Sequence, residues 1–228
     1  PPPPPPPTPR HGVRRQRQMC IRDRPEDIIR NGIDGDGDGE VSLKSSAPDA
    51  LLSGANLLRS LGWRNGEPWM QEVIMPDNFD WSLTGLETHK RASDWVEIGV
   101  RPRSGELSGP GLNASVLLPQ GRQGPAFLVY PNFDVFFEWN QSFIYVTTAA
   151  YFATRLQGAP VYQPGNPTPA LNENQMKSLQ SKLSERGHDV GGVDGILGAK
   201  TRKAVQLEQK RLGLPADAWP TRDLLNGL

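Results

Sequence analysis

The chain has 228 residues, with 25 Lys and Arg against 25 Asp and Glu, so its formal net charge at neutral pH is zero. A hydrophobic content of 36% and a charged content of 22% are typical of globular proteins, and the length allows one or two domains. The balanced charge excludes a global basic field that would attract nucleic acid or anionic lipid. We therefore expect no nucleic-acid partner. No apolar run approaches the roughly 20 residues of a transmembrane segment.

Residues 1–24 are interpreted as a non-native or disordered tail. Residues 1–7 are all proline, which favours polyproline II without internal hydrogen bonds, and the basic run at 14–18 has no apolar face to bury. Residues 17–24 resemble translated sequencing-adaptor sequence, so an export signal would not be visible. The alternative is a basic, proline-rich arm that binds an SH3-like partner or nucleic acid.

The sequence pattern of residues 25–157 predicts a compact domain with both helices and strands. A helix is predicted over residues 49–61, because apolar residues recur at helical spacing and Gly62 ends the pattern. Residues 114–118 and 126–130 predict the two strands of a hairpin. A second, largely buried helix is predicted from about residue 140 to residue 156.

The C-terminal quarter of the chain has its own signals. Residues 158–171 are rich in proline and lack periodicity, which is typical of a semi-rigid linker. Residues 172–228 predict three short helices in a small separable domain. Asn172 is placed to cap the first of these helices, and Pro220 stands near the start of the third.

The strongest local chemical signal is the acidic run DGDGDG at residues 34–39. Alternating carboxylates, with a glycine at the sixth position and a backbone carbonyl at the seventh, can wrap oxygen ligands around Ca²⁺. The twelfth position is Ser45, where an EF-hand has a bidentate glutamate, so the closing ligand is expected from beyond the loop. We expect one structural Ca²⁺, and the alternative is a metal-free turn. The candidate ligands are Asp34, Asp36, Asp38, Glu40 and Asp49.

Several motifs occur in an order that resembles the lytic murein transglycosylase B family. They are DGDGDG at 34–39, SAPDALLSGAN at 46–56, LGWRNGEPW at 61–69, GPAFLV at 124–129 and WNQSFIY at 139–145. The resemblance covers residues 25–157. It implies an α+β, mainly α fold, the C-terminal portion of a lysozyme-like domain with a small β-hairpin region.

Residues 172–228 resemble a peptidoglycan-binding type 1 domain of three helices. The resemblance rests on VDGILG at 193–198, followed by Thr201 and by Ala204 and Val205. Glu208 departs from it, because the family commonly has Phe there, and this thins the apolar face. Asp194 and Arg202 are candidates to contact the wall peptide or sugar, and the alternative is that they only hold the turn closed.

The resemblance implies cleavage of the MurNAc–GlcNAc β-1,4 bond to a 1,6-anhydro product by one glutamate that acts as acid and then as base. In the family that glutamate lies in a Glu-Ser-x-Phe/Tyr-Gly segment before the acidic loop, and this sequence has no Glu-Ser dipeptide. We therefore assign no catalytic residue and expect this polypeptide to be inactive alone. The second hypothesis is a non-catalytic cell-wall-binding protein. Both imply peptidoglycan glycan strands and stem peptides as partners, a periplasmic or cell-envelope location, and a monomer.

The resemblance also implies part of a saccharide groove. Trp139, Asn140 and Tyr145 match positions at which an aromatic face stacks on a pyranose and an amide bonds the N-acetyl group. Trp139 and Leu57 stand where the family has Tyr. The alternatives are core packing for Tyr145 and a helix cap for Asn140.

Three further titratable residues carry weaker expectations. His89 and His188 have no Cys or His at metal spacing, so both are expected to be isolated surface residues. Glu138 adjoins the aromatic cluster and could be considered as a replacement for the missing catalytic glutamate. We do not assign it this role, because the sequence indicates neither a second carboxylate beside it nor its burial.

Overall fold

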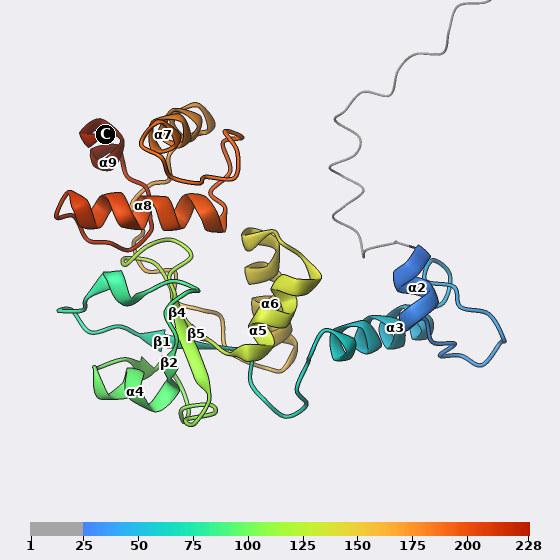
Figure 1. Cartoon of the computed structure of the whole chain (residues 1–228). Helices are drawn as coiled ribbons and strands as arrows, with labels where there is room; N and C mark the ends of the chain where they lie inside the picture. Colours follow the sequence, from blue (N-terminus) through green and yellow to red (C-terminus); the bar gives the residue numbers. More distant parts are fainter. Residues whose placement is uncertain (1–24) are drawn as a thin grey trace, which may run out of the picture. The chain divides into compact units, whose positions relative to one another are not determined.

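The computed structural model describes residues 25–228, which form two compact units, residues 25–63 and residues 64–228 (Figure 1). The expectation for residues 1–24 lies outside the described residues. The division between the units falls inside the predicted domain of residues 25–157, whereas the predicted linker at 158–171 separates no units.

The first unit contains two helices joined by the acidic loop. Helix α2 spans Pro25–Asn31 and α3 spans Ala47–Ser60. Helix α3 begins two residues before its predicted start because Ser46 caps it, and the Ser46 hydroxyl accepts a hydrogen bond from the Asp49 amide at 3.3 Å. The Ser53 hydroxyl accepts from the Ile33 amide at 2.9 Å, which ties α3 to the chain after α2.

The second unit is built on an antiparallel sheet with the strand order β2-β4-β5-β1-β3. The predicted hairpin is confirmed as β4 and β5, with Val116 opposite Leu128. Strand β1 extends the sheet on the other side of β5, with Met70 opposite Val129. The strands are β1 Met70–Ile74, β2 Lys90–Arg91, β3 Arg101–Pro102, β4 Asn113–Leu117 and β5 Ala126–Val129.

The core of this sheet forms around Trp95, which lies on helix α4 (Ala92–Glu97) and is fully buried. The Trp95 indole donates a hydrogen bond to the Ala114 carbonyl at 2.8 Å, so the buried nitrogen has a partner. A short 3₁₀ helix, η1 (Trp81–Leu83), covers the same core, and Phe79 packs between the Trp81 and Trp95 rings.

Two helices follow the sheet where one was predicted. Helix α5 spans Pro131–Trp139 and α6 spans Phe143–Leu156. The chain is extended at Asn140 (φ −146°, ψ 122°), and the Ser142 hydroxyl then caps α6. The predicted start near residue 140 is therefore wrong by three residues, because Asn140 ends α5 and does not cap α6.

The three predicted C-terminal helices are present as α7 Glu173–Glu185, α8 Ala199–Arg211 and α9 Arg222–Gly227. Asn172 and Gln175 form a reciprocal capping box at the start of α7. Thr221 caps α9, so Pro220 precedes the helix and does not begin it. The buried core of this three-helix segment consists of Leu171, Met176, Leu179, Leu183, Val190, Leu197, Ala204, Val205 and Leu224.

The proline-rich segment at 158–171 has no helix or strand, as predicted, but hydrogen bonds hold it along its length. The Gln163 amide donates to the Glu72 carboxylate and the Asn166 amide donates to the Gln123 carbonyl, each at 2.8 Å. These contacts explain why the second unit continues through the segment.

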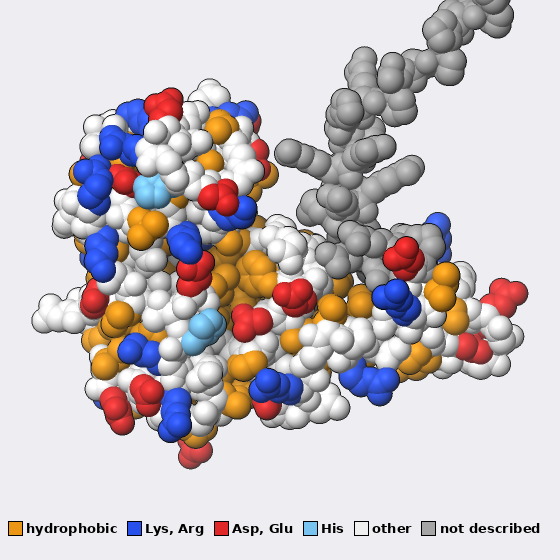
Figure 2. All heavy atoms as spheres, viewed as in Figure 1, with side chains coloured by type: hydrophobic (Ala, Val, Ile, Leu, Met, Phe, Trp, Pro, Cys, Tyr) orange, Lys and Arg blue, Asp and Glu red, His pale blue; other side chains and the backbone are white. Residues whose placement is uncertain are grey.

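The surface carries charges of both signs. Figure 2 shows Lys and Arg side chains interspersed with Asp and Glu over the visible face, as the balanced composition leads one to expect. Within the described residues, no helix has the length and apolar character needed to cross a membrane.

Candidate functional site

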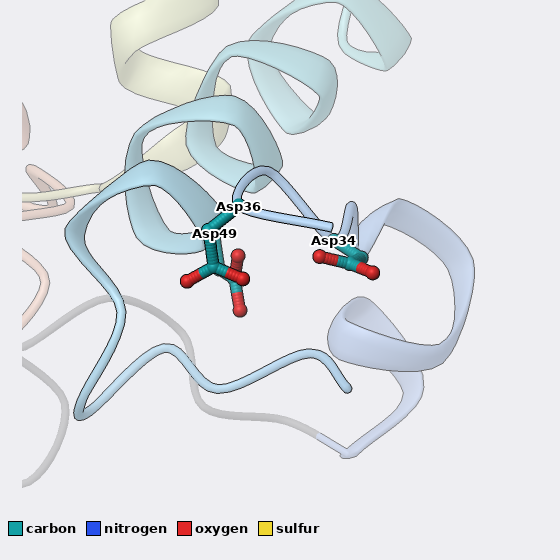
Figure 3. Close-up of side chains that lie close together, drawn as sticks. All are labelled: Asp34, Asp36 and Asp49. Carbon is teal, nitrogen blue, oxygen red and sulfur yellow. The ribbon is translucent and has the colours of Figure 1, made fainter. Parts of the chain in front are cut away.

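The acidic loop gathers three of its five candidate ligands. Oxygen atoms of Asp34, Asp36 and Asp49 lie within 4.8 Å of one another, the first two from the loop and the third from the first turn of α3 (Figure 3). The Asp38 carboxylate is outside this group, and the backbone carbonyl expected from Glu40 stays a prediction, because the group consists of side-chain carboxylates only. The Asp38 carboxylate instead accepts a hydrogen bond from the Glu40 amide at 2.9 Å, as in an Asx turn.

Asp49 joins the loop to the helix. Its side chain is fully buried, and its two oxygens accept hydrogen bonds from the amides of Gly35 (2.8 Å) and Ser42 (2.7 Å). The bonds from Ser42 and Gly35 hold the pKa of Asp49 below its usual value, against the opposing effect of burial. Asp49 is therefore an ionised carboxylate at neutral pH.

The loop backbone is shaped by a second carboxylate. The Asp34 oxygens accept from the amides of Gly37 (2.6 Å) and Gly39 (2.8 Å). Both glycines have positive φ angles, 79° and 92°, a conformation that side chains rarely adopt. The alternating glycines thus allow the chain to fold around the Asp34 carboxylate.

The three predicted groove residues lie together at the junction of α5 and α6. The Trp139 and Tyr145 rings are in contact, with their centroids 5.4 Å apart at an interplanar angle of 49°. The Asn140 amide oxygen accepts a hydrogen bond from the Ser142 amide at 2.9 Å, so this side chain has a structural role in the turn. Both rings remain partly exposed, and a saccharide-binding role for the three residues stays a prediction.

Sequence analysis missed a neighbouring carboxyl on α5. Asp134 lies one helical turn before Glu138. Burial raises the pKa of Asp134, the charge of His89 opposes this effect, and the charge of Glu138 adds to it. A search for carboxylates four residues apart would have found the pair.

Asp194 holds the glycine-rich turn before α8. Its carboxylate accepts hydrogen bonds from the buried Gln180 amide at 3.1 Å and from the Ile196 backbone amide at 2.9 Å. The Gln180 oxygen accepts from the Gly195 amide at 2.8 Å. Asp194 is exposed to solvent. Its hydrogen bonds nevertheless favour the alternative in which it keeps the turn closed.

Arg202 contacts the β4–β5 loop, a role that sequence analysis did not consider. Its guanidinium donates to the carbonyls of Leu118 (3.3 Å) and Pro119 (2.6 Å) and lies 4.3 Å from the centre of the Phe143 ring. Burial lowers the pKa of Arg202 to about 10, with a smaller opposing effect from Asp217, so the group stays charged at neutral pH. The buried side chain neither closes the turn nor faces solvent, and these contacts disfavour a direct contact with wall peptide or sugar.

Other side chains of α8 make contacts of the same kind. The Gln206 amide donates to the Thr84 carbonyl at 2.8 Å, and Lys203 forms an exposed ion pair with Glu87 at 2.6 Å. The three-helix segment is therefore attached to the sheet segment through about one turn of α8, from Arg202 to Gln206.

The structure corrects the expectation for His188, which is paired with Glu208. His188 lies 2.9 Å from the Glu208 carboxylate, so it is not isolated, and Arg211 donates to the other Glu208 oxygen at 2.8 Å. Burial acts to raise the pKa of Glu208, but the hydrogen bonds of His188 and Arg211 outweigh it and hold the pKa below its usual value. Both oxygens of the buried Glu208 carboxylate therefore have a partner.

Comparison with known proteins decides the family. The transglycosylase SLT domain family matches residues 24–154, which is more than half of the chain. The chain belongs to the transglycosylase SLT domain family. The putative peptidoglycan binding domain family matches residues 172–228, which places α7, α8 and α9 in that domain type. A comparison with curated proteins gave no significant match.

Solved structures with the same fold include SltB3 from Pseudomonas aeruginosa in complex with NAG-anhNAM-pentapeptide and with NAG-NAM-pentapeptide. Each is 40% identical with a TM-score of 0.76, over 89% of this chain and 56% of that chain. This SLT-family chain thus spans about half the length of those relatives. The Escherichia coli lytic transglycosylase Slt35 in complex with calcium is 24% identical with a TM-score of 0.44, over 58% of this chain and 43% of that chain. The similarity to SltB3 confirms the expected mixed, mainly helical fold.

Proposed function

We propose that this chain is part of a lytic transglycosylase that cleaves peptidoglycan glycan strands, and that residues 172–228 bind the cell wall. The observation that carries the proposal is the 40% identity to SltB3 over 89% of this chain, including both matched domains. The anhydro sugar bound to SltB3 is of the type that an internal attack by a sugar hydroxyl forms. A cell-envelope location and a monomeric state belong to the same proposal.

Wall binding is tested by sedimentation. The 228-residue chain is expected to pellet with purified sacculi and to remain in solution with insoluble cellulose, which lacks the peptide. Equal recovery in both supernatants would contradict wall binding. Light scattering after size-exclusion chromatography tests the monomer.

We propose that the Trp139–Tyr145 pair is a sugar-stacking surface. Two contacting, partly exposed rings present the apolar faces on which pyranose C–H groups stack. Trp139→Ala is expected to weaken binding of an NAG-NAM oligosaccharide by roughly tenfold, since one aromatic contact is worth about 1.5 kcal/mol. Phe152→Ala is the matched control, because Phe152 lies exposed on α6 outside the ring pair. Equal losses in the two variants would refute the assignment.

We infer that this polypeptide lacks the acid that the proposed activity requires. The sequence has no Glu-Ser dipeptide, so we expect no anhydromuropeptides when the 228-residue chain is incubated with sacculi and the products are analysed by mass spectrometry. Anhydro products would contradict this expectation. The variants Asp134→Asn and Glu138→Gln would then show whether the carboxyl pair on α5 supplies the acid.

The missing dipeptide also favours the second candidate, a wall-binding protein without catalysis. A Glu-Ser-x-Phe/Tyr-Gly segment encoded in frame upstream of residue 25 would favour the enzyme. An upstream sequence without such a segment would favour the binding protein.

We propose that Asp34, Asp36 and Asp49 bind one structural Ca²⁺. Carboxylate oxygens suit this cation, and those of the three residues lie close enough for shared coordination. Calcium is expected to raise the melting temperature of the parent chain but not of an Asp34→Asn Asp36→Asn double variant. Asp38→Asn is the control, because Asp38 lies outside the group, and it should retain the calcium effect. If calcium raised the melting temperature of the double variant as much as that of the parent, the calcium site would be refuted and the loop would be a metal-free turn.

A further inference from the structure

A pocket of about 520 Å³ lies where three parts of the second unit meet. They are the β4–β5 loop, the end of the proline-rich segment and the chain from the end of α8 to the start of α9. Its lining includes Arg122, Gln123, Thr168, Trp219, Arg222 and Asp223. The pocket lies outside the acidic loop and the α5–α6 junction.

Two arginines in this lining are available to a ligand. Within residues 25–228, neither the Arg122 nor the Arg222 guanidinium has an ion-pair or hydrogen-bond partner, and both residues are exposed. A second pocket of about 570 Å³, beside α8, differs in this respect. There Lys200 pairs with Asp189 and Lys203 pairs with Glu87.

The backbone that carries Arg122 is fixed by a buried carboxylate. The Asp217 side chain, 7% exposed, accepts a hydrogen bond from the Arg122 amide at 3.0 Å and others from the Gln209 side chain and the Trp219 amide. These bonds use both Asp217 oxygens. Asp217 therefore shapes the pocket and leaves the guanidinium of Arg122 free.

The Trp219 ring is fixed in the same way. Its indole nitrogen donates to the Thr168 carbonyl at 2.8 Å. Gly121 has a φ of 75°, and a Cβ atom there would lie 2.6 Å from the Cβ of Trp219, so only glycine allows this approach. Trp219 and the Arg122 backbone thus form a preorganised surface, which lowers the entropic cost of binding.

We infer that this pocket binds the carboxylate-bearing end of a peptide. A planar guanidinium matches a carboxylate with two parallel hydrogen bonds, and Arg122 and Arg222 offer two such groups. The Trp219 ring offers an apolar face to the peptide. The negative charge of Asp223 disfavours binding of a polyanion. The same carboxylate can pair with an amine on a ligand that carries both an amine and a carboxylate. The inference rests on the proposed function, under which the ligand is the peptidoglycan stem peptide with its free carboxylates.

Calorimetric titration of the 228-residue chain with a synthetic stem tetrapeptide tests the inference. Arg122→Gln and Arg222→Gln are each expected to weaken binding by roughly tenfold, the loss of one charge-assisted pair. Arg122→Gln keeps the backbone bond to Asp217, so the pocket should stay folded. Arg30→Gln is the control, because Arg30 is an exposed arginine of the first unit. The same peptide with all carboxylates amidated should bind at least tenfold more weakly.

The outcomes separate this site from the proposed function. Equal affinity of the parent and an Arg122→Gln Arg222→Gln double variant for the tetrapeptide would overturn the site, as would equal affinity of the parent for the free and amidated peptides. Sedimentation with sacculi without tetrapeptide binding would overturn the site and leave wall binding intact. If the chain neither sedimented with sacculi nor bound the tetrapeptide, both the wall-binding proposal and the peptide site would be overturned.

Discussion

Substitution of Arg202 tests whether the three-helix segment is anchored to the sheet segment. Arg202→Ala removes two hydrogen bonds to the β4–β5 loop and the contact with the Phe143 ring. Arg202→Met removes the charge but keeps an apolar chain against the ring. Lys203→Ala is the neighbouring control, because Lys203 forms only an exposed ion pair with Glu87.

The expected loss of unfolding free energy in Arg202→Ala follows from two opposing effects. Burial lowers the Arg202 pKa from 12.5 to about 10, and at about 1.4 kcal/mol per pKa unit this costs roughly 3 kcal/mol. Two hydrogen bonds from a charged donor contribute about 1.5–3 kcal/mol each, and a desolvated cation–π contact contributes about 2 kcal/mol. The contacts therefore exceed the cost by about 2–5 kcal/mol.

Urea unfolding monitored by tryptophan fluorescence measures the difference. Arg202→Ala is expected to lose about 2–5 kcal/mol, and Arg202→Met about half as much, because the Met side chain still packs against the Phe143 ring. Lys203→Ala should lose at most about 1 kcal/mol. Values for Arg202→Ala and Lys203→Ala within about 0.5 kcal/mol of each other would refute the anchoring role, since that is the usual scatter of surface substitutions.

Three further substitutions have defined outcomes. The folded-state pKa of Glu208 lies below its ordinary 4.5, so its ionisation stabilises the fold above that pH and the contribution is lost as the pH falls through the folded pKa. Glu208→Gln should therefore reduce stability at pH 7 but not after full protonation, as measured by urea unfolding across pH 3–7. Asn132→Ala should cost about 3 kcal/mol or more in urea unfolding, because it leaves the Arg64 amide, the Arg64 carbonyl and the Glu67 carbonyl without their partner; a loss under about 1 kcal/mol would contradict this. Asn172→Ala should lower stability by about 1 kcal/mol through loss of the capping box, and an unchanged urea midpoint would contradict it.

Local patterns predicted much of the fold. The α7 core residues Met176, Leu179 and Leu183 and the Asn172 cap follow from spacing alone and are confirmed. The β4–β5 hairpin is confirmed for the same reason, because its strands are adjacent in the sequence. Strands β2 and β3 have two residues each, which is too short for any periodicity to indicate them.

Other features depend on residues far apart in the sequence. Helix α5 was missed because its run of aromatic and apolar residues shows no clear polar face, and such a short apolar run does not distinguish a strand from a buried helix. Arg202 lies in a motif, which suggested a ligand contact, but its partners are 83 and 84 residues away. At the acidic loop, the sequence named Asp34, Asp36 and Asp49 among its candidate ligands, and only the fold shows that the carboxylates of these three lie together.

The hydrogen-bonded proline-rich segment changes how multivalent binding should be calculated. A flexible tether gives its second binding site an effective concentration that depends on tether length. Residues 158–171 are hydrogen-bonded to Glu72 and Gln123, so they do not form a freely flexible tether. Peptidoglycan sites on the two segments would then be engaged together over a narrower range of spacings along a glycan strand than a free tether allows, and lengthening the segment would widen that range without raising the affinity of either site.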